Sequence, residues 1–311
     1  MRCRLRRRPR HLSLVAAGLA ALLLSAACGG AARTPVEPRD PAVLRLASFD
    51  FPENRMLAEL YGQRLRQAGF RVEVLTGLGT REVVAPALRQ GLVDLVIDYT
   101  GSLLDYSGGS AAQAHGTPES VRAALADRLS GRGLSVLRPA PAEDANGFAV
   151  RTSFARDNGL TRLSDLRPLA GRLTFGGPPE CPQRRYCLQG LQASYGLGFK
   201  AFRPQPTREA TATALETGEI DVGLLETTYG RLADGRVTLL TDDRGLQPRE
   251  NVVPVVRTKV LRRYGTRLTE VLDGLSARLD TADLIALNRL GTVDPRSPAD
   301  VAATYLSDLA G

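Results

Sequence analysis

The stretch Ala87-Leu-Arg-Gln-Gly-Leu-Val-Asp-Leu-Val-Ile-Asp-Tyr-Thr100 returns later in the chain as Ala214-Leu-Glu-Thr-Gly-Glu-Ile-Asp-Val-Gly-Leu-Leu-Glu-Thr227. Each copy predicts a helix that ends at a glycine, followed by a strand that begins at an aspartate. The strand is apolar without alternation, which is typical of a parallel sheet covered on both faces. Each strand ends in polar residues, and open α/β sheets bind ligands at that edge. Two copies therefore predict two α/β lobes whose strand ends face a shared cleft.

The rest of the chain fits two lobes. Strand and helix patterns alternate from residue 43 to residue 97, which predicts a mostly parallel sheet flanked by helices. Pro139-Ala-Pro141 predicts a crossing into the second lobe, and an apolar run at 252–256 predicts the return. We therefore expect a first lobe built from residues 42–139 and 251–311, with a second lobe, residues 140–250, inserted into it. Predicted helices at about 268–279, 282–290 and 298–309 close the chain.

The first 27 residues predict an export signal rather than a part of the fold. Six arginines within the first ten residues precede an apolar stretch from Leu12 to Leu24 and a group of small residues. The apolar stretch is too short to span a membrane. Cys28 follows, as in the bacterial lipobox, although Ser25 stands where that pattern prefers leucine. We expect lipidation of Cys28 and a tether over residues 28–41; ordinary secretion is the alternative.

Loss of this segment changes the charge balance. The whole chain has a formal net charge of +8, but six of its 41 basic residues belong to the signal, so 35 face 33 acidic residues in the remainder. A nearly neutral protein lacks the basic surface on which nucleic-acid binding depends. The composition therefore argues against a nucleic-acid partner.

Two cysteines remain beyond Cys28, close together in Glu180-Cys-Pro-Gln-Arg-Arg-Tyr-Cys187. An exported pair at this spacing predicts a disulfide between Cys181 and Cys187. A separate prediction is a helix over residues 184–195. Zinc or a redox pair are the alternatives, but zinc usually needs four ligands and His115 is the only histidine outside the signal. One histidine also leaves no Ser-His-Asp or Cys-His set. We expect no catalytic activity, no metal and no cofactor.

Polar residues stand at two places suited to a ligand. Thr80 and Arg81 begin a predicted helix, whose free N–H groups favour the anionic end of a ligand. A plain helix cap with a solvated arginine is the alternative there. Tyr99 ends the first repeated strand, where an aromatic ring either packs in the core or holds a quaternary ammonium. Such a group has no N–H to donate and is bound by cation–π contact.

Short motifs in a fixed order make the chain similar to a known family. They include Phe51-Pro-Glu-Asn54, Leu78-Gly-Thr-Arg-Glu82, Leu163-Ser-Asp-Leu166, Asp242-Asp243 and the two repeated segments. With these motifs the chain resembles the substrate-binding proteins of osmoprotectant ABC transporters, which take up glycine betaine, choline and carnitine. The resemblance implies the two-lobed type II periplasmic-binding-protein fold, with a mixed, mostly parallel sheet in each lobe. It also implies an ABC permease and its ATPase as partners.

The resemblance further implies an aromatic cage at four places. Tyr99 matches the first place and Phe148 the second. Glu226 and Glu250 stand at the third and fourth, where the family has rings, and Tyr229 offers a ring from a shifted position. Two carboxylates in place of two rings weaken the case for a fully methylated ammonium, because a carboxylate prefers a cation with N–H donors.

We therefore expect a lipid-anchored, monomeric receptor that holds a small cationic or zwitterionic solute between its lobes. Tyr99 and Glu226 occupy equivalent places in the repeat, so Tyr99 is expected to give a ring face and Glu226 to neutralise the ligand's charge. Asn54, Thr100 and Thr227 are expected to add hydrogen bonds. The alternatives are a receptor for an N–H-bearing solute of the ergothioneine or basic amino acid type, a transferase-type enzyme on the same fold, and a regulatory sensor module.

Overall fold

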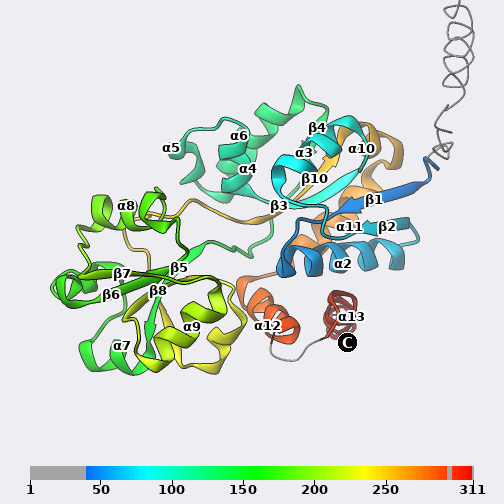
Figure 1. Ribbon diagram of the computed structural model, residues 1–311. Helices are drawn as coiled ribbons and strands as arrows, with labels where there is room; N and C mark the ends of the chain where they lie inside the picture. Colours follow the sequence, from blue (N-terminus) through cyan, green and yellow to red (C-terminus); the bar gives the residue numbers. More distant parts are fainter. Residues whose placement is uncertain (1–39, 293–295, 310–311) are drawn as a thin grey trace, which may run out of the picture. The chain divides into compact units, whose positions relative to one another are not determined.

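The computed structural model describes residues 40–292 and 296–309, and this part of the chain contains two five-stranded sheets (Figure 1). The expected export signal at 1–27, Cys28 and nearly all of the tether lie outside the described residues. Among the helices that are described, none is both long enough and apolar enough to cross a membrane.

The first sheet has the strand order β2-β1-β3-β10-β4. β1 lies parallel to β2 and β3, whereas β10 runs antiparallel to β3 and β4. Every residue of β3 is buried, as expected for a strand covered on both faces. The strands are β1 (Val43–Ala47), β2 (Arg71–Leu75), β3 (Leu95–Tyr99), β4 (Leu134–Val136) and β10 (Val252–Arg257).

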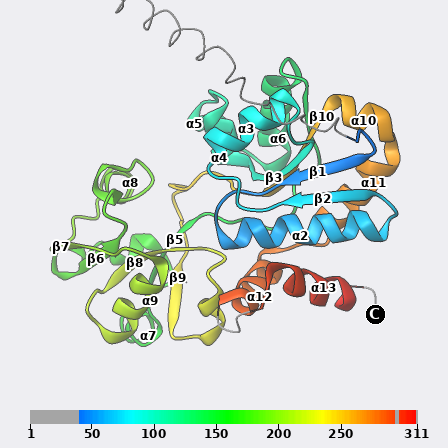
Figure 2. The same ribbon diagram turned by 45° about the vertical axis from the view of Figure 1, so that its right-hand side comes forward.

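The second sheet repeats this arrangement with the order β7-β6-β8-β5-β9. β6 lies parallel to β7 and β8, and β5 runs antiparallel to β8 and β9. In each sheet the antiparallel strand next to the parallel trio is the first strand after a crossing from the other sheet (Figure 2). The expected fold of two mixed sheets is confirmed. The strands are β5 (Asn146–Arg151), β6 (Thr174–Gly177), β7 (Ala201–Pro204), β8 (Val222–Glu226) and β9 (Val237–Leu240).

The repeated segment forms the same helix end in both sheets. α3 (Arg81–Gln90) ends at Gly91 with φ of 79°, and α9 (Arg208–Thr217) ends at Gly218 with φ of 77°. Glycine is the residue that adopts this left-handed conformation without steric cost. The chain then turns directly into β3 or β8, as the sequence predicts.

The aspartate of each repeat joins two neighbouring strands. The carboxylate of Asp94 accepts a hydrogen bond from the backbone N–H of Arg45 at 3.1 Å. Asp221 does the same for the N–H of Thr174 at 2.8 Å. Arg45 lies in β1 and Thr174 begins β6, so the repeated aspartate fixes the register of the parallel strands on which the ligand edge depends.

Helices cover both faces of the sheets. α2 (Pro52–Gln67) buries its apolar side and approaches β2 so closely that a Cβ atom on Gly62 would lie 2.5 Å from Cγ2 of Val74. The other α-helices in order are α4 (Thr100–Tyr106), α5 (Ala111–Ala114), α6 (Pro118–Ser130), α7 (Thr152–Asn158), α8 (Leu188–Gly190), α10 (Thr258–Tyr264), α11 (Thr266–Ser276), α12 (Thr281–Thr292) and α13 (Pro298–Asp308).

Helix α12 contacts the structure around both sheets. Its Leu284 and Leu287 are buried in the core of the first sheet. On the other side, Asn288 donates from Nδ2 to the carbonyl oxygen of Thr228 at 2.9 Å, beyond the end of β8. A Cβ atom on Gly230 would lie 2.5 Å from the backbone nitrogen of Arg289. Helix α12 therefore contacts both halves of the fold, whereas the sequence predicted that it belongs to the first lobe.

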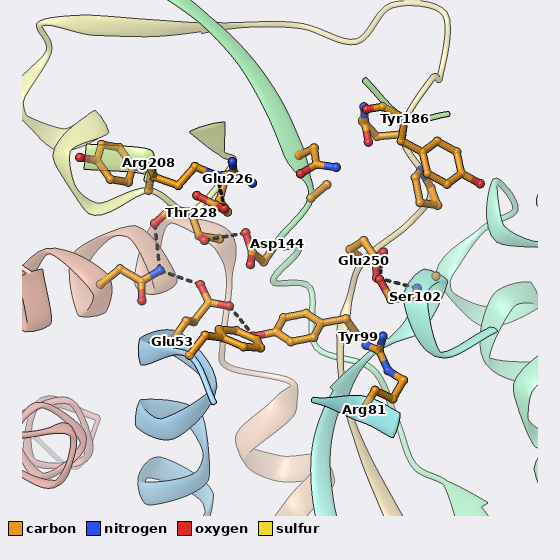
Figure 3. A pocket seen from close by; sticks show the side chains of 18 of the residues that line it. Glu53, Arg81, Tyr99, Ser102, Asp144, Tyr186, Arg208, Glu226, Thr228 and Glu250 are labelled. Carbon is orange, nitrogen blue, oxygen red and sulfur yellow. Dashed lines mark hydrogen bonds and ion pairs between the residues drawn. The ribbon is translucent and has the colours of Figure 1, made fainter. Parts of the chain in front are cut away.

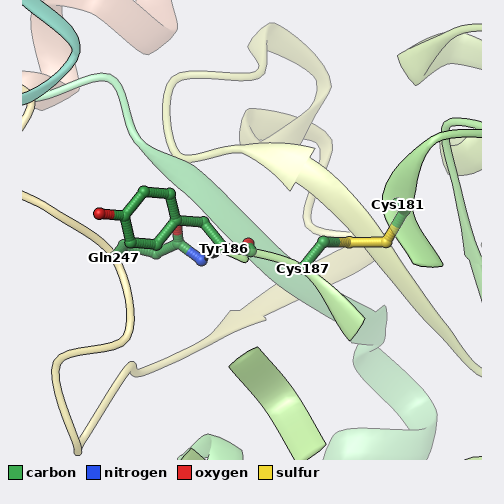
Figure 4. Close-up of a disulfide and its surroundings, with 4 residues drawn as sticks. All are labelled: Cys181, Tyr186, Cys187 and Gln247. Carbon is green, nitrogen blue, oxygen red and sulfur yellow. Dashed lines mark hydrogen bonds between the residues drawn. A yellow bond between two sulfur atoms is a disulfide. The ribbon is translucent and has the colours of Figure 1, made fainter. Parts of the chain in front are cut away.

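The prediction of a continuous helix over 184–195 is wrong. α8 spans only Leu188–Gly190, and a π-helical turn, Leu191–Tyr195, follows it. The expected disulfide joins Cys181 to Cys187, whose Cα atoms lie 5.4 Å apart (Figure 4). Because this bond turns the chain back on itself, residues 184–187 follow a loop instead of a helix.

Candidate functional site

A cavity of about 840 Å³ is lined by residues from both halves of the fold (Figure 3). Tyr99 reaches it from the end of β3 and Glu226 from the end of β8, so the two repeated strand ends do meet at one cavity. The segment that leads into β10 adds Glu250, and the first turn of α2 adds Glu53. The volume is in the range of small-molecule binding sites.

Tyr99 presents its ring to the cavity while its hydroxyl group is held. The hydroxyl donates to Oε1 of Glu53 at 2.7 Å. The ring of Phe51 lies beside it, with the ring centroids 5.9 Å apart. Burial and the nearby carboxylate of Glu53 raise the pKa of Tyr99, so the phenol keeps the proton that it donates. The pair of rings forms an apolar wall with a carboxylate at its edge.

Glu53 is a buried carboxylate with two neutral donors. Tyr99 donates to Oε1, and Nδ2 of Asn288 donates to Oε2 at 2.6 Å. Only 7% of the residue is exposed. Asn288 lies 235 residues later in the sequence and also holds the carbonyl oxygen of Thr228. Glu53 is therefore fixed at the place where α2, β3 and α12 meet.

Two further carboxyl groups lie near Glu53. Asp144, on the segment that crosses to the second sheet, accepts a bond from Oγ1 of Thr228 at 2.7 Å. Burial raises the pKa of Asp144, and the charges of Glu53 and Glu226 raise it further. Glu226 forms an ion pair with Arg208, yet its burial still raises the pKa of Glu226. Close carboxylates in a partly desolvated place disfavour a second negative charge.

Glu250 lies on the cavity wall next to α4. Its Oε2 accepts from the backbone N–H of Ser102 at 3.0 Å, and its Oε1 accepts from the Ser102 hydroxyl at 2.5 Å. Burial raises the pKa of Glu250 to about 7, against the opposing effect of these bonds and of Arg81. The group therefore changes charge near neutral pH.

The helix start proposed for the ligand's anionic end is occupied by protein groups. Arg81 lines the cavity, but its Nη2 and Nε atoms bind the buried carboxylate of Asp98 at 2.6 and 3.1 Å. Its guanidinium group also lies over the ring of Phe49. Thr80 is exposed and is outside the cavity wall. Arg81 is not available to an anionic group of the ligand, because Asp98 pairs with it within the protein.

Three other predicted residues hold backbone segments together instead of lining the cavity. Asn54 is fully buried and donates from Nδ2 to the carbonyl oxygen of Ile97 at 2.8 Å. Thr100 donates to the carbonyl oxygen of Arg249 at 2.9 Å. Thr227 accepts from the N–H of Ala145 at 2.9 Å. Thr100 and Thr227 thus bind the two crossing segments at equivalent points of the repeat.

Phe148 is not on the wall of this cavity. Its side chain is 1% exposed and packs against Phe175, with centroids 6.0 Å apart. The strand register gives the reason: Asn146 lies opposite Glu226 and lines the cavity, whereas Phe148 lies opposite Leu224, two residues further along. Of the ring positions that the resemblance implied, the structure brings Tyr99 to the cavity, together with Glu226, Glu250 and the shifted Tyr229.

The disulfide loop supplies a ring that the sequence does not reveal. Arg184 and Tyr186, between the two bonded cysteines, both line the cavity. The carbonyl oxygen of Tyr186 accepts from Nε2 of Gln247 at 2.9 Å (Figure 4), and its ring packs edge-on against His115. Since Cys181 and Cys187 are bonded to each other, neither is free to act as a nucleophile.

Sequence reasoning also missed Asp144 and Asn288. Asp144 follows the predicted crossing Pro139-Ala-Pro141, so its place at a lobe junction was a usable signal. Asn288 reaches the site through the folding of α12 against the segment after β8; the sequence motif Leu287-Asn288, which is part of the family resemblance, does not by itself indicate this.

Comparisons with known proteins agree with the fold described above. Residues 42–308 match the family described as the substrate binding domain of the ABC-type glycine betaine transport system. The chain belongs to this family. It is 30% identical to the glycine-betaine-binding protein of Pseudomonas aeruginosa, over 85% of this chain and 87% of that protein. It is 28% identical to the glycine betaine-binding protein YehZ of Escherichia coli, over 88% of this chain and 92% of that protein.

Solved structures give the same result for the fold. Apo YehZ from Escherichia coli superposes with a TM-score of 0.74 at 25% identity, covering 86% of this chain and 98% of that one. A protein described as a glycine betaine/carnitine/choline ABC transporter superposes with a TM-score of 0.77 at 20% identity, covering 85% and 98%. The expected membership in the osmoprotectant-binding family and its type II fold are confirmed.

Proposed function

We propose that this chain is the extracytoplasmic receptor of an ABC importer and that it binds a small cationic or zwitterionic osmoprotectant of the glycine betaine, choline or carnitine type. The ligand occupies the cavity at the ends of β3 and β8. Lipidated Cys28 anchors the receptor, which works as a monomer with a permease and its ATPase. The family match over residues 42–308 supports the class of protein.

The observation that carries this proposal is the ring of Tyr99 beside buried carboxylates. Among the described residues, seven Asp and Glu side chains but only three arginines line the cavity, so its wall has an excess of negative charge. A cation gains from this field and from the ring faces of Tyr99 and Phe51. A solute without a cationic group lacks both contributions.

Calorimetric titration of the purified protein tests the proposal. We expect saturable binding of at least one of glycine betaine, choline and carnitine. Tyr99→Ala should weaken it about thirtyfold, because a cation–π contact at a desolvated place contributes about 2 kcal/mol. Tyr99→Phe keeps the ring and should preserve most of the affinity.

Tyr264→Ala is the matched control, since this tyrosine packs edge-on against Phe70 and is not on the cavity wall. It should leave the affinity unchanged. The osmoprotectant assignment fails if none of the three solutes binds. The placement of the ligand fails if Tyr99→Ala binds as tightly as the unchanged protein.

A further inference from the structure

We propose that this cavity selects a cation that carries N–H donors, such as a guanidinium or a primary ammonium group, over a quaternary ammonium, and that Glu53, Asp144 and Glu226 bind it together. This inference rests on the proposed receptor function, and it differs from that proposal in placing N–H cations ahead of the quaternary osmoprotectants as the preferred ligand. The three residues are called the carboxyl triad below.

The carboxyl triad comes from three separate segments that meet only in the folded protein. Glu53 lies in the first turn of α2, Asp144 on the segment that leads into β5, and Glu226 at the end of β8. All three line the cavity (Figure 3). They join the two halves of the fold around one space, so a ligand that satisfies all three holds both halves.

Each member of the triad is oriented by a different donor. Tyr99 and Asn288 donate to Glu53, the hydroxyl of Thr228 donates to Asp144, and Arg208 binds Glu226. These contacts position acceptor oxygens around the cavity. The arrangement is built to receive hydrogen bonds, not only to supply a negative field.

Quaternary ammonium groups fit such acceptors poorly. Their methyl groups donate no N–H, so the carboxyl oxygens would lose water without gaining a hydrogen bond, which is costly for a buried charged group. A guanidinium or primary ammonium donates several charge-assisted bonds at once. A site built around hydrogen bonds rejects analogues that lack the donors more strongly than an apolar site rejects a missing methyl group.

A metal ion is the other natural partner for clustered carboxylates. Within residues 40–292 and 296–309, no three Asp, Glu, His or Cys side chains come close enough together to hold one. The three carboxyl groups line one cavity, and an organic cation with several N–H groups can donate to more than one of them.

Without a ligand, Asp144 keeps its proton more readily than an ordinary aspartate. Burial and the charges of Glu53 and Glu226 raise its pKa. The groups that act on Asp144 are Glu53 from α2, Tyr99 from β3, Glu226 from β8 and Thr228 from the segment after β8. Arg208 from α9 binds Glu226, and Asn288 from α12 binds Glu53.

Binding of an N–H cation therefore favours loss of the Asp144 proton. The O–H bond of the Asp144 carboxyl group breaks, its proton passes to the buffer, and the carboxylate keeps the electron pair with which it accepts the ligand's N–H. Because the complex holds fewer protons than the free partners, affinity rises with pH until free Asp144 is itself ionised.

Calorimetry with four probes tests the inference: L-arginine and agmatine as N–H cations, glycine betaine and choline as quaternary ones. We expect an N–H cation to bind at least tenfold more tightly than either quaternary compound. Titrations in two buffers with different ionisation enthalpies should show proton release. Asp144→Asn resembles the protonated acid, so it should keep the fold, reduce proton release and weaken N–H cation binding about tenfold.

Glu226→Gln is a second variant and should weaken the same probe without abolishing proton release. Glu119→Gln is the control, because Glu119 is an exposed carboxylate outside the cavity wall and should leave binding unchanged. Equal or tighter binding of a quaternary compound, or no proton release, overturns this inference and leaves the receptor function standing. Failure of all four probes to bind overturns the inference, whereas the proposed function is decided by the titrations with glycine betaine, choline and carnitine.

Discussion

Glu250 shows how burial at a single residue makes this protein sensitive to pH. Burial raises the pKa of Glu250 to about 7 from an ordinary value of 4.5, although Ser102 and Arg81 favour its charged form. The folded chain therefore binds this proton more tightly than the unfolded chain does. Such a group contributes stability below the unfolded pKa, and the contribution disappears as the pH rises through the folded pKa.

We predict that the free energy of unfolding of the wild type, measured relative to Glu250→Gln, falls by up to roughly 3 kcal/mol between about pH 4 and pH 8. The glutamine variant cannot ionise, so it lacks this loss. Urea denaturation of both proteins at the two pH values measures it. An exposed residue, Glu119, provides the control as Glu119→Gln. A difference in unfolding free energy that does not change with pH would disprove the assigned burial effect.

Individual residues also show how much of the site could be predicted from the sequence. The ring of Tyr99 and the carboxylates of Glu226 and Glu250 were predicted at the site and do line the cavity. Phe148 was misplaced by two residues along β5, because the pairing of β5 with β8 sets which residue is opposite Glu226. Arg81 was predicted correctly at a helix start, but its partner Asp98 could not be identified without the fold.

At the scale of elements, the two repeated segments behave as one structural unit used twice. Each unit ends a helix at a left-handed glycine and ties its strand to a neighbour through an aspartate. The two aspartates differ in one respect. Asp94 also pairs with Arg257 at 3.3 Å and is 3% exposed, whereas Asp221 is only partly buried.

We predict that Asp94→Ala lowers the free energy of unfolding by about 3 kcal/mol, since it removes a buried carboxylate that binds both the N–H of Arg45 and the partly exposed Arg257. Asp221→Ala should cost about 1 kcal/mol, the contribution of a hydrogen bond. Asp157→Ala removes an exposed ion pair with Arg156 and should have almost no effect. Chemical denaturation of the three variants measures the order, and a larger loss from Asp221→Ala than from Asp94→Ala would contradict it.

The repeat made the elements predictable because helix ends and buried strands leave local patterns in the sequence. The segment 184–195 was mispredicted because its conformation depends on the bond between Cys181 and Cys187, which acts across a loop. Edge strand β7 was not predicted either, since its residues are mostly exposed and carry no buried apolar run.

In the molecule as a whole, the site depends on contacts between distant parts of the chain. Helix α12 packs in the first core through Leu284 and Leu287 and places Asn288 between Glu53 and Thr228. The crossing segments are joined by a β-bridge between Glu143 and Asn251. The sequence predicted two lobes and two crossings, but it gave no sign that a C-terminal helix completes the site.

We expect the cationic end of the ligand to lie against Tyr99 and Glu226, at the two repeated strand ends. A crystal structure of the protein with the cation that binds most tightly in the titrations tests it most directly. We predict electron density for the ligand in the cavity of about 840 Å³, with its cationic group over the ring of Tyr99 and within hydrogen-bonding or ion-pairing distance of the carboxyl triad. Density for the ligand only in the neighbouring hollow of about 540 Å³ beside Phe148 would show that the repeated strand ends do not form the ligand site.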